Sequence, residues 1–150
     1  MNPIYFILSI YSVCMIVLVI LWLQSGFDKI TDYKGNLAWL NGHFSKSFFK
    51  NGVPFLLGTL TFFEIITGAT ALLSLAELWI YHTCTLSFCT CGLSLLSLLC
   101  LFTGQRIAKD YAGAASLMGY FIYVLLLFAF TYVVSDYLNN PILSSTDPAP

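Results

Sequence analysis

The stretch VPFLLGTLTFFEIITGATALLSLA, residues 53–76, contains a single charged side chain, Glu64. At about 1.5 Å per residue, a helix of this length crosses the hydrocarbon core of a bilayer and places Glu64 near the midplane. A carboxylate at that depth costs on the order of 3 kcal/mol on insertion scales, so such a residue usually faces protein or a water-filled cavity. The stretch therefore predicts a membrane-spanning helix whose acid faces the interior of a bundle.

The composition of the whole chain agrees with this interpretation. The chain of 150 residues is 59% hydrophobic and only 9% charged, whereas about a quarter of the residues of a soluble domain are charged. Because so few charges could not keep a surface wet, lipid is expected to solvate most of it. The net charge of −1 gives no reason to expect nucleic acid as a partner.

Three further uncharged runs are also long enough to span a membrane. Only helices and closed barrels satisfy the backbone in hydrocarbon, and these runs are too long and continuous for barrel strands. The sequence therefore predicts an all-α integral membrane bundle of four transmembrane helices within residues 1–138, followed by a polar, proline-containing tail, residues 139–150, that is disordered unless a partner holds it. The predicted spans are residues 4–23, 53–76, 83–104 and 111–135.

The first run has no basic segment before it and no clear cleavage site, so we expect a retained transmembrane helix rather than a signal peptide. Every basic residue falls in the first or the third connection between spans. The positive-inside rule therefore predicts that these two connections face the cytoplasm of a bacterial inner membrane and that both termini face the periplasm. These residues are Lys29, Lys34, Lys46, Lys50, Arg106 and Lys109.

The first connection carries its own periodic pattern. Leu37, Leu40, Phe44 and Phe48 recur at spacings of three and four residues. This pattern predicts an amphipathic helix within residues 27–51, lying at the membrane interface, packed on the bundle, or both. The short second connection, residues 77–82, predicts that spans two and three form an antiparallel hairpin.

Small residues indicate where helices can approach closely. They gather in the second and fourth spans, so we expect these two spans to touch there. Gly26 is expected to cap the first helix, with Lys29 at its negative end. The small residues are Gly68, Ala69 and Ala71 in the second span, and Ala112, Ala115, Ser116 and Gly119 in the fourth.

Glu64 is the first candidate site. Its functional interpretations are proton transfer or a hydrogen bond to a polar ligand such as a quinone headgroup. Its structural interpretation is a protonated carboxyl bonded to a hydroxyl of Thr61, Thr67, Tyr120 or Tyr123. We therefore take Glu64, Tyr120 and Tyr123 as candidate residues for binding quinone or lipid.

Three basic residues form a second candidate set. Lys29, Arg106 and Lys109 are candidates for contact with lipid headgroups or a partner protein. Arg106 and Lys109 are three residues apart and could share a helical face. The alternative is that they only anchor the topology.

Other chemistry has little support in the sequence. Cys84, Cys89 and Cys91 cluster without a C-x-x-C pair, so we expect packing residues rather than a redox pair. His43 and His82 lie in connections, whereas a membrane haem commonly needs facing histidines within spans. We assign no catalytic or metal-binding residue, and no cofactor bound by this chain alone; quinone is the one candidate.

Several of these features occur together in one known family. The first span leads into Gly26-Phe27-Asp28-Lys29, the second contains PFLLGTLTFFEIITGATALL at residues 54–73, and RIAKDYAGAA occupies residues 106–115. This combination resembles the DoxX-like family of small four-helix bacterial membrane proteins, although the third span, rich in Ser, Cys and Leu, departs from the family's alanine-rich pattern. The resemblance implies the four-helix fold. Through the family's namesake, a subunit tied to thiosulfate:quinone or terminal quinol oxidation, it also implies a quinone-linked role.

We therefore expect an accessory subunit of a larger inner-membrane complex, respiratory or otherwise quinone-linked, in contact with lipid and with other membrane subunits. A subunit that itself oxidises a substrate with quinone would need a redox centre that no residue set here supplies. A scaffold or assembly factor, in which Glu64 latches helices together, remains an alternative. A small transporter is a further one, although there is no matched pair of broken helices.

Overall fold

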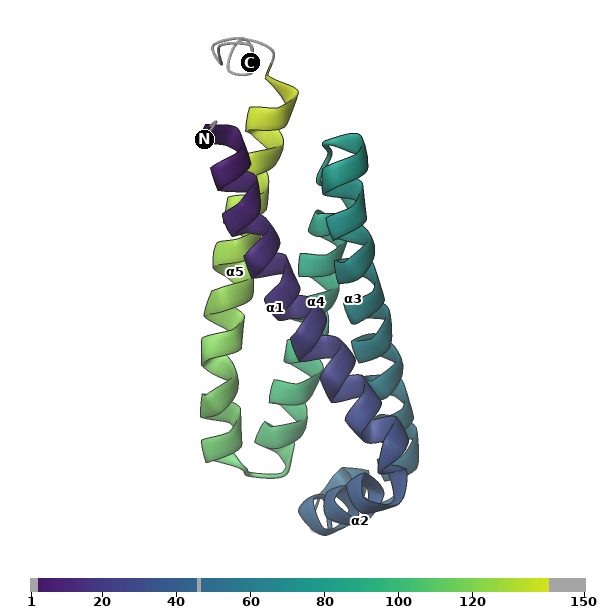
Figure 1. Cartoon of the computed structure of the whole chain (residues 1–150). Coiled ribbons are helices and arrows are strands. Elements are labelled where there is room, and N and C mark those ends of the chain that lie inside the picture. The colour runs from purple at the N-terminus through teal and green to yellow at the C-terminus, as the bar shows by residue number, and fades with distance from the viewer. Residues whose placement is uncertain (1–2, 46, 141–150) are drawn as a thin grey trace.

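The computed structural model describes residues 3–45 and 47–140, and over these residues it contains helices and turns but no strand. Four of the helices are long and apolar enough to cross a membrane, so the chain is a multi-pass helical membrane protein (Figure 1). The elements in chain order are α1 (Pro3–Thr31), α2 (Tyr33–His43), the 3-10 turn η1 (Phe48–Asn51), α3 (Val53–Tyr81), α4 (Thr85–Ile107) and α5 (Tyr111–Asn139).

Each of the four long helices overlaps a predicted span, but three of them continue well beyond it. Hydropathy locates the apolar part of a helix, and α1 runs on through polar residues until Asp32 begins α2 by accepting a hydrogen bond from the Gly35 amide at 3.0 Å. Gly26 therefore lies inside α1, and the prediction that it caps the helix is wrong. Pro54 stands in the first turn of α3, where it disturbs no helical hydrogen bond. Most of the predicted tail, residues 141–150, lies outside the described residues.

The long helices form a ring in which α1 and α4 are each flanked by α3 and α5. Helix α3 packs against α1 and α4, and α5 packs against α4 and, more narrowly, α1. Figure 1 shows α1 crossing the bundle at a slant, from α5 near the N-terminus to α3 at the other end. The hairpin predicted for spans two and three is present as α3 and α4, joined through His82, whose backbone is left-handed with φ 52°.

The predicted contact between spans two and four is wrong. Gly68 of α3 faces α1, because a Cβ added there would lie 3.0 Å from the Leu23 backbone nitrogen. On α5, Ala115, Ser116 and Gly119 are exposed. Small residues show that a helix permits close approach, but they do not say which helix approaches.

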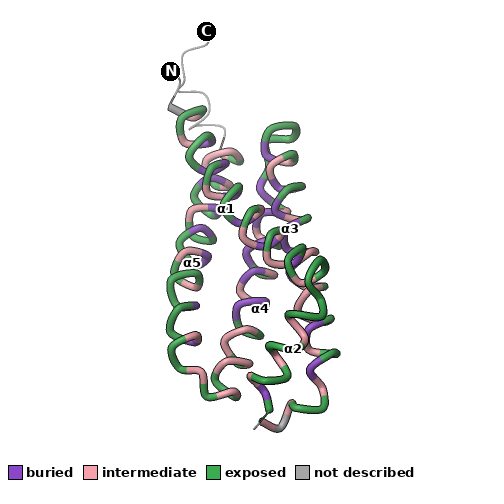
Figure 2. Tube along the Cα trace, turned by 60° about the horizontal axis from the view of Figure 1, so that its bottom comes forward, coloured by how far each residue is buried: buried purple, intermediate pink, exposed green. Residues whose placement is uncertain are grey.

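Polar side chains pack in the interior of this bundle, chiefly on α3 and α4. Trp22 of α1 donates to Ser94 at 2.9 Å, and the hydroxyls of Ser74 and Thr90 share a hydrogen bond of 3.0 Å between α3 and α4. Such hydrogen bonds join helices where lipid leaves no hydrophobic driving force between them. Figure 2 shows buried residues turned inward and exposed residues along the outer faces of the long helices. Ser94 and Thr90 therefore tie the serine-rich third span to α1 and α3.

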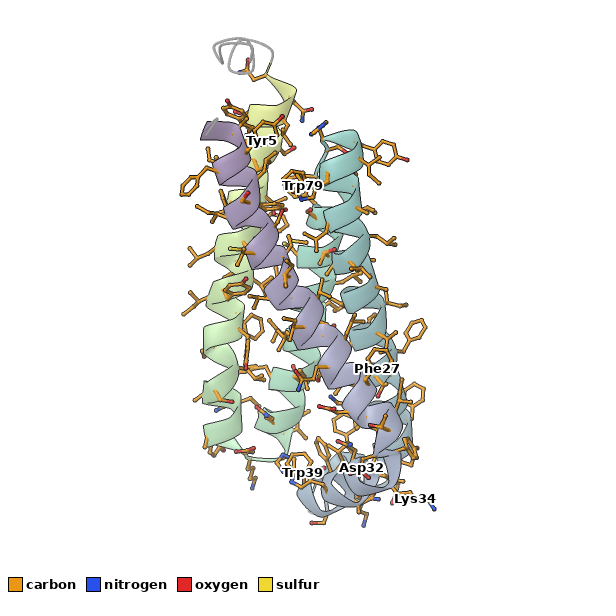
Figure 3. All side chains as sticks on the ribbon, viewed as in Figure 1. Tyr5, Phe27, Asp32, Lys34, Trp39 and Trp79 are labelled. Atoms are coloured by element: carbon orange, nitrogen blue, oxygen red, sulfur yellow. The ribbon has the colours of Figure 1, made fainter. Side chains whose placement is uncertain are left out.

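The two ends of the bundle differ in charge. The first turn of α1 and the last turn of α5 lie at one end, and α2 and the turn between α4 and α5 lie at the other (Figure 1). The first and third connections, which carry every basic residue, therefore share one end, as the predicted topology requires. Exposed Trp39 and Lys34 lie at that end, and Tyr5 and Trp79 lie toward the opposite one (Figure 3). Aromatic side chains at both ends are typical of the two membrane interfaces.

Candidate functional site

Glu64 is completely buried, with 0% of its surface exposed, on the face of α3 that packs against α1. Lys29, in the last turn of α1, donates from Nζ to Glu64 Oε1 at 3.0 Å, and Ser25 Oγ donates to the same oxygen at 3.0 Å. Lys29 Nζ also lies 2.9 Å from Oε2, but outside hydrogen-bond geometry, so that contact is electrostatic. The carboxyl of Glu64 is thus held by an ammonium and a hydroxyl from one neighbouring helix.

The cluster is tied together within α1 as well. Lys29 Nζ donates to Ser25 Oγ at 2.8 Å and to the Ser25 carbonyl at 3.2 Å. Residues four apart lie on one face of a helix, so Ser25 and Lys29 both point toward α3. We call Ser25, Lys29 and Glu64 the α1–α3 cluster.

Two glycines allow α1 and α3 to approach closely beside this cluster. A Cβ at Gly26 would lie 2.6 Å from Ile65 Cδ1, and one at Gly68 would lie 2.6 Å from Leu23 Cδ2. These distances are too short for a real Cβ, so a larger residue at either position would force the facing side chain to move; at Gly68 the Leu23 backbone nitrogen, 3.0 Å from the added Cβ, also limits how closely the helices could then pack. One glycine from each helix therefore brings Lys29 within reach of Glu64.

The hydrogen-bond partners predicted for Glu64 were wrong. Thr61 and Thr67 bond to carbonyls of their own helix, at 2.7 Å and 2.6 Å. Tyr123 donates to the Cys14 carbonyl at 2.7 Å, and Tyr120 is 45% exposed. Hydropathy ends the first span at residue 23 and so places Lys29 in a loop, whereas α1 continues to Thr31 and Lys29 faces α3 from its last turn.

The candidate residues Glu64, Tyr120 and Tyr123 do not come together. Tyr123 reaches α1 at Cys14, whereas Glu64 reaches it at Ser25, eleven residues further along. That separation is about 16 Å along the helix. Glu64 and Tyr123 therefore do not share one binding site.

The other predicted basic residues have separate surroundings. Arg106 lies over the ring of Tyr111, 4.7 Å from its centre. Lys109 follows the end of α4 in a left-handed conformation with φ 63°, so the helical face that it was predicted to share with Arg106 does not form. Asp110 caps α5 by accepting from the Gly113 amide at 2.8 Å. Lys109 is exposed.

The cysteines are all free thiols. Cys84, in the turn between α3 and α4, is buried, and its burial together with the nearby Glu77 carboxylate raises its pKa to about 11. Glu77 also caps α4, since its carboxylate accepts from the amides of Thr85 at 3.0 Å and Leu86 at 2.8 Å. Within residues 3–45 and 47–140, no three His, Cys, Asp or Glu side chains are grouped so that they could hold a metal ion.

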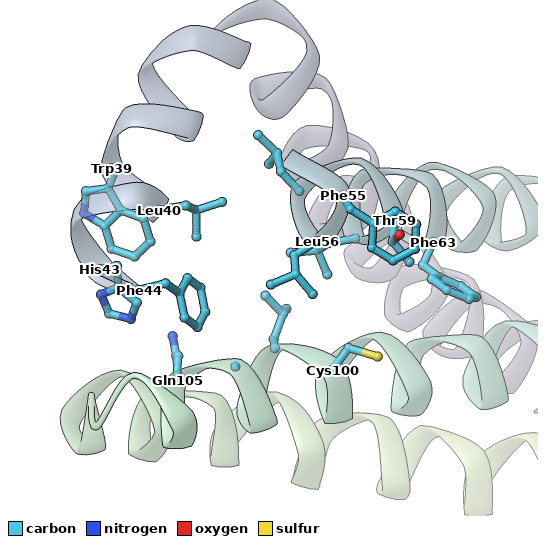
Figure 4. A pocket seen from close by; sticks show the side chains of 14 residues that line it. Trp39, Leu40, His43, Phe44, Phe55, Leu56, Thr59, Phe63, Cys100 and Gln105 are labelled. Carbon is cyan, nitrogen blue, oxygen red and sulfur yellow. The ribbon is translucent and has the colours of Figure 1, made fainter. Parts of the chain in front are cut away.

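A pocket of about 190 Å³ lies between α2, α3 and α4, apart from the α1–α3 cluster (Figure 4). Leu40 and Phe44 line it, so the predicted amphipathic segment packs on the bundle with part of its apolar face. The sequence pattern gave the face of the helix but not the cavity beneath it. The lining residues are Trp39, Leu40, His43, Phe44, Phe55, Leu56, Leu57, Thr59, Leu60, Phe63, Cys100, Leu101, Gly104 and Gln105.

No protein-family model, curated protein or solved structure matches this chain.

Proposed function

We propose that this chain is an accessory subunit of a larger bacterial inner-membrane complex, quinone-linked and related to the DoxX-like family, in which the α1–α3 cluster acts as a latch. The observation that carries the proposal is the enclosure of Glu64. A carboxyl that exchanges protons or binds a ligand needs a face toward water or a cavity. Glu64 is 0% exposed and does not line the pocket between α2, α3 and α4, while Lys29 and Ser25 occupy its oxygens.

The position of the cluster suggests what the latch holds. Lys29 stands in the last turn of α1, three residues before Asp32 begins α2. Fixing Lys29 to α3 therefore fixes the point where the chain leaves the bundle for α2. We infer that the latch positions α2, with its exposed Trp39, for a partner or a membrane surface.

The outer surface supports a role within an assembly. Large apolar side chains are exposed along all four long helices, including Val13 on α1, Phe62 on α3, Leu99 on α4 and Leu126 on α5. Lipid covers such faces, and another membrane subunit can replace that lipid. The charge difference between the two ends supports placing α2 on the cytoplasmic side. The quinone link is supported by the sequence motifs that resemble the DoxX-like family.

A scaffold or assembly factor without a redox role is the second candidate, and the same enclosure of Glu64 favours it. Because Glu64 is enclosed and acts as a latch in both cases, Glu64→Gln should lower the amount of assembled complex and leave the activity per complex unchanged. The two candidates are separated by the complex that retains the chain: it reduces quinone if the chain is a quinone-linked subunit, and it contains no quinone-reactive subunit if the chain is a scaffold. Glu77→Gln, which alters an acid remote from the α1–α3 cluster, is the matched control.

The experiment that tests the proposal is purification of the tagged full-length protein from the membranes of its own host in a gentle detergent, followed by mass spectrometry. We expect membrane proteins in stoichiometric amounts, including a cytochrome or another quinone-reactive subunit. Recovery of the chain alone, or as a homodimer only, would overturn the proposal. Recovery of partners without any redox subunit would favour the scaffold.

A further inference from the structure

The pocket between α2, α3 and α4 has apolar walls over most of its surface. Leu40 and Phe44 come from the α2 side, Phe55 and Phe63 from α3, and Leu101 from α4. Figure 4 shows Leu40 and Phe44 on one side of the cavity and Phe55 and Phe63 on the other. A space of about 190 Å³ with such walls suits a hydrocarbon chain, because burying apolar surface there is favourable.

One end of the pocket is polar and incompletely bonded. His43 Nε2 and Gln105 Oε1 are both buried, and neither has a hydrogen-bond partner among the described residues. Both residues line the pocket, and Figure 4 shows the side-chain amide of Gln105, from α4, beside His43 and Phe44, with its nitrogen toward them. Buried polar atoms are nearly always hydrogen-bonded in folded proteins. Two such atoms at one end of an apolar cavity therefore point to a ligand that carries a polar group.

The charges around this end restrict the kind of polar group. Asp110 Oδ2 lies 3.9 Å from His43 Nε2, so a carboxylate borders the site and disfavours an anionic headgroup. A hydroxyl meets both needs, because it can donate to Gln105 Oε1 and accept from an Nε2–H of His43. Trp39 holds the imidazole in place by stacking on it, with ring centres 4.6 Å apart.

The mouth of the pocket indicates where the ligand comes from. Trp39 and Phe55 line the pocket and are also exposed, Trp39 on α2 and Phe55 in the first turn of the membrane-spanning helix α3. Tryptophan is typical of headgroup depth in a bilayer. The free hydroxyl of a neutral glyceride lies at this depth, with its acyl chains extending into the hydrocarbon.

We propose that this pocket binds a neutral glyceride of the membrane, with its hydroxyl between His43 and Gln105 and an acyl chain along Phe44, Phe55 and Phe63. The proposal does not depend on the proposed function. An accessory subunit and a scaffold would have the same pocket, and an ordered lipid there would fasten α2 to α3 and α4.

The test is native mass spectrometry of the purified full-length protein, titrated in detergent with dioleoylglycerol. Dioleoylphosphatidic acid supplies the same chains with an anionic headgroup, and decylhydroquinone supplies hydroxyls on a ring. The variants are Gln105→Leu and His43→Phe. Gln24→Leu, the same substitution at an exposed position of α1, is the matched control. Thermal melting checks that each variant is folded, and His43→Phe answers the question if Gln105→Leu does not fold.

We expect one saturable dioleoylglycerol per chain, bound about tenfold more weakly by Gln105→Leu and by His43→Phe because each loses a hydrogen bond. Gln24→Leu should bind as the unaltered protein does, and phosphatidic acid should bind at least about tenfold more weakly than dioleoylglycerol. The proposal would be overturned if dioleoylglycerol and phosphatidic acid bind equally and neither pocket variant changes their binding. That result would mean that the lipid binds to the outer surface and that water occupies the polar end of the pocket. Tighter, Gln105-dependent binding of decylhydroquinone would overturn the choice of a glyceride.

Discussion

The α1–α3 cluster makes a quantitative prediction about the stability of the bundle. Lys29→Met removes the ammonium but keeps the length of the side chain, and Glu64→Leu removes the carboxylate but keeps a side chain of similar size. At the observed Nζ–Oε1 distance of 3.0 Å and an effective dielectric constant of about 20, two unit charges attract each other by about 5–6 kcal/mol. The cost of removing both charges from water offsets most of this attraction.

Each single variant should therefore lower the free energy of unfolding by more than the double variant does. Lys29→Met leaves a carboxyl that is 0% exposed without its counter-charge, which we expect to cost about 3 kcal/mol. In Glu64→Leu, the side chain of Lys29 is 16% exposed and can extend toward the headgroups. We therefore expect this variant to lower the free energy of unfolding by about 2 kcal/mol. The double variant replaces a buried ion pair with apolar groups and should cost about 1 kcal/mol or less.

The assay is reversible unfolding of the full-length protein by dodecyl sulfate in mixed micelles, followed by tryptophan fluorescence. The expected coupling energy between Lys29 and Glu64, the sum of the two single losses minus the loss in the double variant, is about 4 kcal/mol or more. Lys29→Met combined with Glu77→Leu, at the far end of α3, is the control and should be additive. If the Lys29–Glu64 double variant costs as much as the two singles together, to within about 0.5 kcal/mol, the reasoning is refuted.

Three further outcomes follow from other parts of the structure. Gly68→Ala should lower the free energy of unfolding by about 1–3 kcal/mol because its Cβ would meet Leu23. Gly92→Ala, where an added Cβ enters open space, should not lower it. A dodecyl sulfate titration of both variants checks this. Glu77→Ala should cost about 1 kcal/mol in the same titration through the lost helix cap. In a variant whose only cysteine is Cys84, the rate of maleimide labelling should rise about tenfold per pH unit from pH 8 to 10, because the thiolate is the reactive form and burial raises the pKa of the Cys84 thiol to about 11. A rate that levels off near pH 9 would show that the thiol is not buried.

The spanning helices could be predicted from the sequence because hydropathy depends on composition alone. Uncharged runs of about 20 residues have few alternatives in lipid, so the four spans and the hairpin of α3 and α4 were predicted correctly. The exact ends of the helices were not, because α1 continues past the apolar run to Thr31. A helix needs only local hydrogen bonds to continue, and hydropathy does not report these.

The partners of Glu64 could not be derived in the same way. Which helix lies beside Glu64 depends on the packing of the whole bundle, and Gly68 was equally compatible with a contact to α5 or to α1. A signal was nevertheless present in α1. Ser25 and Lys29 are four residues apart and share one face of any helix that continues past residue 23.

The pocket was beyond sequence analysis because its residues come from three separate segments. Leu40 and Phe44 were recognised as one apolar face of the segment between α1 and α3. Gln105 carried no distinguishing pattern, since its meaning depends on its position opposite His43 (Figure 4). Convergence of side chains from distant segments is a property of the tertiary fold.

Helix α3 packs directly against α1, and this contact encloses Glu64. Disulfide formation in native membranes can detect the contact, in a full-length background without the natural cysteines. Leu23→Cys with Gly68→Cys should form a disulfide readily, because a Cβ at residue 68 lies 3.0 Å from the backbone nitrogen of residue 23. Gly68→Cys with Ala115→Cys, which joins α3 to the exposed face of α5, should form none. A disulfide between residues 68 and 115, and none between residues 23 and 68, would contradict the account.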